Sequence, residues 1–163
     1  MAQTRPVNVD GSESTRAIVP YSIKESDPFK SVPKEEKIPD TDRYRGNSVN
    51  GKREGQGKLT FADGSFYKGS FTQNKMNGFG NYYWPDGRSY VGQWRKNKMH
   101  GEGELKWNNG KSYKGQFVED KREGEGTFNW ADGSTYTGGW KAGKQHGVGT
   151  MTSKTGVLKQ GEW

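Results

Sequence analysis

The chain has 163 residues, of which only 28% are hydrophobic and 25 are glycine, and it carries a formal net charge of +7. So few apolar residues, and a glycine share about twice the usual ~7%, argue against a thick two-layer core. The absence of cysteine excludes disulfides, thiol catalysis and cysteine-ligated zinc sites. Aromatic residues still reach 13%, so we expect an ordered structure.

The N-terminus shows no targeting signal. MAQTRPVNVDGS lacks the apolar core of a secretory signal peptide, and the sequence contains no run of about 18 or more apolar residues. We therefore expect a soluble, intracellular, cytoplasmic protein.

Residues 1–43 differ in composition from the rest of the chain. They carry seven Lys/Arg, eight Asp/Glu and most of the prolines but no tryptophan, which leaves a net charge of +8 for residues 44–163. This composition predicts an extended or disordered tail. Its one apolar patch, IVPYSI at 18–23, is interpreted as a linker segment or as a motif that docks on a partner.

A period of 23 residues organises the chain after the tail. Tyrosine recurs at Tyr44, Tyr67, Tyr90, Tyr113 and Tyr136, glycine follows two places later, and an aromatic residue follows four places later at Phe71, Trp94, Phe117, Trp140 and Trp163. Glycine pairs stand at 55/57, 78/80, 101/103, 124/126 and 147/149, and a further set of rings stands at Phe61, Trp84, Trp107 and Trp130. The predicted repeats are 44–66, 67–89, 90–112, 113–135, 136–158 and a partial unit 159–163.

Within each unit the spacing of related residues is two, which predicts strands. A two-residue turn at Asp63-Gly64 would place Tyr67 on the face opposite Leu59 and would split the rings between two faces. A three-residue loop at 62–64 instead places Leu59 opposite Tyr67 and Gly57 opposite Gly69, so that all the rings share one face. Each unit is therefore expected to be one β-hairpin.

The glycines inside the strands have an expected packing role. A strand glycine is typical of a site where another group approaches the backbone closely, and here the rings would lie on it. We predict an all-β fold: an elongated, single-layer antiparallel sheet of eleven strands, on the order of 50 Å long at about 4.8 Å per strand.

The unit Tyr90-Val-Gly-Gln-Trp-Arg-Lys-Asn-Lys-Met-His-Gly-Glu-Gly-Glu-Leu-Lys-Trp-Asn-Asn-Gly110 resembles the MORN repeat (membrane occupation and recognition nexus). Departures are local: Ser48 replaces the aromatic residue of the first unit, Lys159 replaces the tyrosine of the sixth, and the usual histidine is kept only at His100 and His146. MORN repeats form consecutive β-hairpins in a twisted sheet, in agreement with the pattern above.

The resemblance also implies a class of function. MORN arrays occur as scaffolds in cilia and flagella, notably in radial-spoke proteins, in parasite cytoskeletons and at membrane junctions, and as appendages of enzymes whose catalytic domains would not fit in this chain. We expect a non-enzymatic scaffold without a cofactor, a protein-protein interaction subunit of a cytoskeletal or axonemal assembly. The alternative is a peripheral membrane adaptor that binds anionic phospholipid.

Two candidate interaction surfaces follow from the repeats. The first is a column of lysines at the hairpin tips, about 10 Å apart, which would suit acidic proteins or anionic lipid headgroups or would only increase solubility; its members are Lys52, Lys75, Lys98, Lys121 and Lys144. The second is the ring face, partly used for packing and partly left for a helix or an extended peptide; its members are Tyr67, Phe71, Trp84, Tyr90, Trp94, Trp107, Tyr113, Phe117, Trp130, Tyr136 and Trp140.

Other kinds of site have less support. Around Gly57-Lys58, the P-loop pattern lacks its first glycine and its final hydroxyl residue. The two histidines would lie about 20 Å apart, too far to share a metal. Nucleic-acid binding is disfavoured because the rings are in phase with the glycines and not with the lysines.

The C-terminal segment, with Gly161 and Trp163, is expected to be an exposed edge strand. Exposed edges invite pairing, so this end is expected to pair with another subunit or copy, or else the chain continues beyond it.

Overall fold

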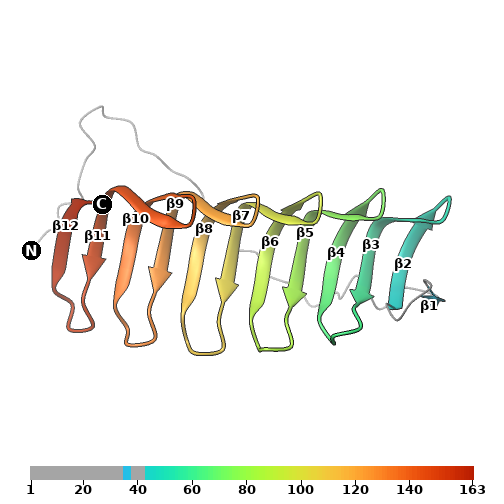
Figure 1. The fold of residues 1–163 in the computed structure, drawn as a ribbon, viewed down its shortest axis with the longest axis horizontal. Coiled ribbons are helices and arrows are strands. Elements are labelled where there is room, and N and C mark those ends of the chain that lie inside the picture. Colours follow the sequence, from blue (N-terminus) through green and yellow to red (C-terminus); the bar gives the residue numbers. More distant parts are fainter. Residues whose placement is uncertain (1–34, 38–42) are drawn as a thin grey trace, which may run out of the picture.

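The computed structural model describes residues 35–37 and 43–163. Twelve antiparallel strands form one sheet in which every strand neighbours the next in sequence, in a single layer (Figure 1). The strands are β1 (Glu35–Lys37), β2 (Arg43–Val49), β3 (Lys52–Thr60), β4 (Phe66–Thr72), β5 (Lys75–Tyr83), β6 (Ser89–Arg95), β7 (Lys98–Lys106), β8 (Ser112–Val118), β9 (Lys121–Asn129), β10 (Thr135–Lys141), β11 (Lys144–Thr152) and β12 (Leu158–Glu162). The predicted all-β, single-layer fold is confirmed.

The N-terminal edge contains one strand that the repeat pattern does not predict. Strand β1 pairs with β2 through Glu35 opposite Arg45 and Lys37 opposite Arg43. It lies in the stretch expected to be extended or disordered, and it brings the eleven predicted strands to twelve. The IVPYSI patch lies outside the described residues.

The hairpins are joined at one edge by the predicted three-residue loops. Leu59 lies opposite Tyr67 and Gly57 opposite Gly69, so the rings share a face as expected. Across the 62–64 loop, the Phe61 N–H donates to the Ser65 carbonyl at 2.8 Å. Gly64 has φ +87°, the left-handed conformation that closes such a loop.

At the opposite edge, each hairpin turns through two residues with positive φ. The pairs are Asn50-Gly51, Gln73-Asn74, Lys96-Asn97, Glu119-Asp120 and Ala142-Gly143. Positive φ at both central residues is the type I′ turn, whose twist matches that of the flanking strands. Figure 1 shows these tips along the top of the sheet, where each hairpin bends over, and the three-residue loops along the bottom.

The bend coincides with a bulge inside every full hairpin. In the β4–β5 pair the register passes from Gly69 opposite Gly80 to Phe71 opposite Met76, so Ser70 alone faces three residues of β5. Gly78, one of the three, has φ +97°. The first glycine of each pair is therefore needed for backbone conformation, because extra residues bend a strand and increase its twist.

The second glycine of each pair is needed for space. A Cβ added to Gly80 would overlap the ring of Tyr67, and the same clash recurs between each tyrosine and the corresponding glycine along the array. The tyrosines consequently lie flat on bare backbone, and Tyr44, Tyr67, Tyr90, Tyr113 and Tyr136 are all 0% exposed. The expected role of glycine as a surface for rings is confirmed.

The core is a continuous chain of edge-to-face rings. Each tyrosine contacts the aromatic residue that follows in the next repeat and, except for Tyr44, that of its own strand, as Tyr67 contacts Phe71 at 5.1 Å and Trp94 at 5.4 Å between ring centroids. The order is Tyr44, Phe71, Tyr67, Trp94, Tyr90, Phe117, Tyr113, Trp140, Tyr136 and Trp163. Since such pairs contribute about 0.5–1.5 kcal/mol beyond area burial, every repeat interface is stabilised in the same way.

Candidate functional site

The hairpin-tip edge carries the predicted lysine column. Each of the five lysines is the first residue of the strand that follows a type I′ turn, and each is exposed. Because successive tips are two strands apart, their backbones repeat at about 9.6 Å. Residues Lys52, Lys75, Lys98, Lys121 and Lys144 thus share one edge of the sheet.

Hydrogen bonds join neighbouring tips along this edge. The Asn97 N–H donates to the Met76 carbonyl at 3.0 Å, and the Met76 N–H donates back to Asn97 Oδ1 at 2.8 Å. Asn74 makes the same pair of bonds with Arg53, and Asp120 makes it with Met99. An Asn or Asp in the second turn position therefore joins each of these tips to the hairpin before it.

The lysines of the column differ in their partners. Lys98 Nζ lies 2.7 Å from Glu119, an ion pair that raises the pKa of Lys98 and lowers that of Glu119. Lys52 donates to Gln73 Oε1 at 2.9 Å. Within the described part of the chain, the ammonium groups of Lys75, Lys121 and Lys144 have no hydrogen-bond or ion-pair partner.

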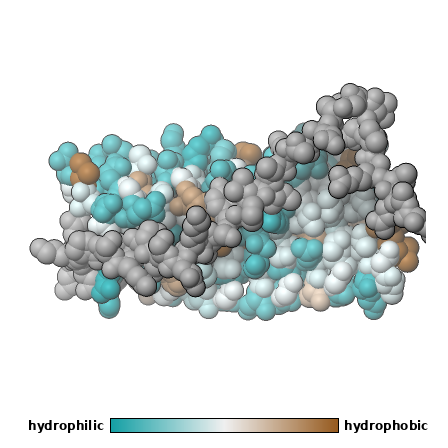
Figure 2. All heavy atoms as spheres, turned by 180° about the vertical axis from the view of Figure 1, so that it is seen from behind, coloured by the Kyte–Doolittle hydropathy of each residue, from teal (hydrophilic) through white to brown (hydrophobic). Residues whose placement is uncertain are grey.

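Charge along the tip edge is uneven. The third tip presents Arg95, Lys96 and Lys98, whereas the fourth presents Glu119, Asp120 and Glu123 beside Lys121 and Arg122. Figure 2 shows the tip edge, uppermost in the view, as mainly hydrophilic with small hydrophobic spots. Two exposed valines account for apolar surface on tips: Val49 and Val118, 57% and 43% exposed, which lie opposite Lys52 and Lys121.

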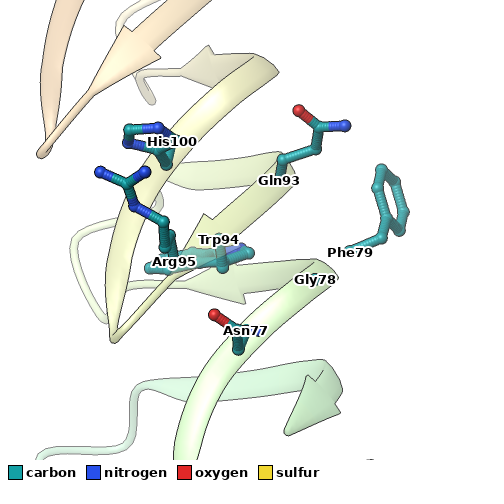
Figure 3. Close-up of a pocket in the computed structure, with 7 residues that line it drawn as sticks. All are labelled: Asn77, Gly78, Phe79, Gln93, Trp94, Arg95 and His100. Carbon is teal, nitrogen blue, oxygen red and sulfur yellow. The ribbon is translucent and has the colours of Figure 1, made fainter. Parts of the chain in front are cut away.

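A shallow hollow lies near the tips of the second and third hairpins (Figure 3). Asn77 and Phe79 of β5, Gln93 and Arg95 of β6 and His100 of β7 contribute to its lining. Figure 3 shows His100 and Arg95 close together, with Gln93 and Phe79 on the other side of the hollow. The hollow contains no catalytic pair of nucleophile and base.

The family is identified by a sequence match that follows the same repeats. The MORN repeat family model matches residues 44–66, 67–87, 90–112, 113–135 and 136–157, more than half of the chain. The chain belongs to the MORN repeat family. No curated protein shows significant similarity to the chain.

The MORN ring face is divided between a buried and a partly exposed set. Eight of its eleven predicted members are buried in the ring chain described above: Tyr67, Phe71, Tyr90, Trp94, Tyr113, Phe117, Tyr136 and Trp140. Trp84, Trp107 and Trp130 are partly exposed, next to the three-residue loops. The bent tips cover part of the buried set, since Met76 is buried against these rings and the Arg122 guanidinium lies 4.5 Å from the Trp140 centroid.

The C-terminal edge of the MORN array is held by its own backbone contacts. Trp163 and Gly147 exchange two backbone hydrogen bonds of 3.0 Å, and the Trp163 ring packs on Tyr136 at 5.1 Å. Gly161 lies opposite Gly149, as in the inner repeats. Trp163 is still 36% exposed, because no further hairpin covers it in this structure.

Groups that could support other functions are few among the described residues. They contain no cluster of three or more His, Cys, Asp and Glu side chains suited to a metal ion. Within the same residues, no helix is long and apolar enough to cross a membrane. Asp63 and Asp132 serve the MORN loops: hydrogen bonds from Ser65 and Ser134 lower the pKa of these carboxyl groups.

Proposed function

We propose that this MORN chain is a non-enzymatic scaffold that binds acidic surfaces of partner proteins through its tip edge. The observation that carries the proposal is the lysine column itself, whose five members repeat every 23 residues along one edge of the sheet. Among the described residues, the ammonium groups of Lys75, Lys121 and Lys144 have no partner and are free to meet a ligand. Evenly spaced cations on a fixed frame attract an extended acidic surface without the entropic cost of ordering a loop.

The wider setting belongs to the same proposal. A quasi-one-dimensional array offers a long surface and few internal degrees of freedom, which suits a structural subunit of a large assembly. We place it in the cytoplasm, on the cytoskeleton or in the ciliary axoneme, where a radial-spoke-type subunit would act. The acidic exterior of a microtubule is one surface of the required charge.

Co-sedimentation with microtubules tests the tip edge. The full chain is expected to bind, and binding is expected to weaken as salt is added, because screening shortens the range of exposed charges. The triple variant Lys75→Glu, Lys121→Glu, Lys144→Glu is expected to bind about 3- to 150-fold more weakly, at a few tenths to 1 kcal/mol for each of three exposed pairs. Undiminished binding by this variant would refute the role of the lysine column.

A matched control separates location from net charge. Lys106, Lys114 and Lys154 are exposed and lie outside the tip edge, so reversing these three lysines changes the net charge by the same amount. This control is expected to bind microtubules nearly as well as the unaltered chain. If both triple variants lose binding equally, only overall charge matters and the tip edge is no specific site.

The exposed valines favour a second candidate, an anionic membrane surface. Val49 and Val118 lie beside column lysines on the same edge, and apolar side chains flanked by cations bind the interface of anionic bilayers. Flotation with phosphatidylcholine vesicles, with or without phosphatidylserine or phosphoinositide, tests this candidate. Flotation should need the anionic lipid and should fall in Val49→Ser/Val118→Ser; the same valine changes should leave microtubule binding intact.

A further inference from the structure

Five of the six tryptophans fall into two chemical classes, and Trp163 lies apart from both at the C-terminal end of the array. Trp94 and Trp140 use their indole N–H groups inside the protein, donating to the carbonyls of Gly80 and Gly126 at 3.1 Å. The indole N–H groups of Trp84, Trp107 and Trp130 have no acceptor in the described part of the chain. These three rings are partly exposed, so the donors can meet a ligand.

Trp84, Trp107 and Trp130 form a regular row, here called the tryptophan row. Each immediately precedes a three-residue loop, and its backbone N–H donates across that loop to a carbonyl, that of Arg88 at 3.0 Å, of Lys111 at 2.9 Å and of Ser134 at 2.9 Å respectively. One side of each outer ring is fixed by the core, since Trp84 contacts Tyr82 at 4.5 Å and Trp130 contacts Phe128 at 4.8 Å. Identical backbone positions thus present an indole every second strand.

The interval of the row matches one kind of peptide. Positions two strands apart are separated by about 9.6 Å. A polyproline II helix has three residues per turn and rises 3.1 Å per residue, so it repeats every ~9.3 Å. Across the three tryptophans the mismatch accumulates to only about 0.6 Å. An extended β-strand ligand crossing the row has no comparable period of three residues.

Hydrogen-bonding character matches the same ligand. The row offers donors, and a proline-rich chain offers only backbone carbonyl acceptors, because proline has no N–H. Polyproline II backbones have no internal hydrogen bonds and leave these carbonyls available, and proline rings pack between aromatic side chains.

The charges beside the tryptophan row indicate how a ligand would be positioned along it. Beside Trp84, the Arg88 guanidinium lies 4.9 Å from the Trp84 ring centroid and is already paired with Asp86 at 2.7 Å. Beside Trp107 the loop is Asn108-Asn109-Gly110, and the Lys111 ammonium has no acidic partner within the described residues. Lys111, an unpaired cation at the middle of the row, complements an acidic side chain at the middle of the ligand.

We propose that the tryptophan row binds a proline-rich segment of a partner protein in the polyproline II conformation, with successive turns over Trp84, Trp107 and Trp130 and an acidic residue facing Lys111. The row lies at the loop edge of the ring face, away from the lysine column. Its binding is therefore independent of the function assigned to the tip edge.

The test uses the full chain and a capped peptide with one glutamate between two runs of proline, long enough to cover three turns, or about nine residues. The control peptide replaces every proline with glycine or serine. In a spectrum of the six indole N–H groups, the proline peptide should shift the signals of Trp84, Trp107 and Trp130 and leave those of Trp94 and Trp140 in place. The control peptide should shift none.

Variants with retained fold complete the test. Phe61 occupies the corresponding position of the first repeat, so Trp107→Phe should fold normally by circular dichroism while losing the indole donor. Its affinity for the proline peptide should fall about 2- to 10-fold, as for loss of one hydrogen bond. Lys111→Glu should weaken binding of the glutamate peptide and spare a peptide of proline alone.

Three results would overturn the proposal. They are equal binding of the two peptides, equal shifts of buried and exposed indoles, and unchanged affinity in Trp107→Phe. A shared effect of the lysine-column variants on peptide binding would likewise contradict the independence of the two surfaces.

Discussion

The hydroxyl of Tyr90 donates a 2.9 Å hydrogen bond to the carbonyl of Gln93, three residues along the same strand. Gln93 is the residue that β6 skips where its register with β7 shifts, between Gly92 and Trp94. The Tyr90 hydroxyl thus satisfies the Gln93 carbonyl at the bulge. The strand glycines in turn leave the space in which the Tyr90 ring lies. The same bond recurs in all five repeats, from Tyr44 to Asn47 through Tyr136 to Gly139, at 2.7–3.0 Å.

Tyr90→Phe should therefore destabilise the array although it keeps the ring. This hydrogen bond is partly buried, so removing the hydroxyl leaves the Gln93 carbonyl poorly satisfied, at a cost of about 1 kcal/mol. Urea unfolding followed by tryptophan fluorescence measures the loss. Tyr83→Phe is the matched control, since Tyr83 is 37% exposed on the opposite face and should change stability by less than about 0.5 kcal/mol. Equal effects of the two variants would contradict this account of the tyrosine.

Gly80→Ala tests whether the second glycine of each pair is needed to leave space for the tyrosine ring. An added methyl group would overlap the Tyr67 ring, and overpacking costs typically about 1–3 kcal/mol, occasionally more. The control is Gly64→Asn, at a loop position with φ +87° and no atom within 4 Å of an added Cβ. Because asparagine tolerates left-handed backbone, this control should unfold at nearly the same urea concentration as the unaltered chain.

The sheet, its register and its ring face could be predicted because they depend on side-chain period. Once Leu59 and Phe61 are required to share a face with Tyr67, only a loop with an odd number of residues fits, and the three-residue loop follows. The two glycines of each pair could not be distinguished in this way. The first glycine is needed because its φ is positive, and the second because there is no room for a Cβ beside the tyrosine ring. The sequence shows only glycine at both positions.

The tip edge shows what sequence period alone does not reveal. Asn50-Gly51 is a strong type I′ signal, but Gln73, Glu119 and Ala142 rarely adopt positive φ and hold it here because their neighbours impose the turn. The hydrogen bonds between tips also depend on the distance between residues of two neighbouring hairpins, which the repeat period alone does not give. The signal that could have found it was the recurrence of Asn74, Asn97 and Asp120 at the 23-residue period.

Gly143→Asn should repair a gap in this tip ladder. At the fifth tip Gly143 donates to the Arg122 carbonyl at 2.9 Å but has no side chain to accept the Arg122 N–H, as Asn97 does for Met76. Its φ of +83° suits asparagine. The change should raise the free energy of unfolding by about 0.5–1.5 kcal/mol, measured by urea unfolding.

The reverse substitution is the control for the ladder. Asn97→Gly removes the acceptor of the Met76 N–H, 2.8 Å away, while glycine keeps the φ of +69° without strain, and it should lower stability by about 1 kcal/mol. If Asn97→Gly is neutral and Gly143→Asn gains nothing, the tip bonds do not stabilise the junction between hairpins.

The buried tyrosines also predict how stability changes at alkaline pH. Burial raises the pKa of Tyr67, Tyr90 and Tyr113 above the ordinary value of about 10. Above that pH the unfolded chain loses its tyrosine protons while the folded chain keeps them, so the unfolded state binds fewer protons and the free energy of unfolding falls as pH rises. Below about pH 10 these groups are protonated in both states and their contribution to stability is constant.

Urea unfolding at stepped pH, with tyrosinate absorbance recorded in parallel, should show this decline in the free energy of unfolding. Tyr90→Phe should show a shallower decline because it has one fewer buried tyrosine. An equal slope in the variant would assign the decline to lysine deprotonation instead.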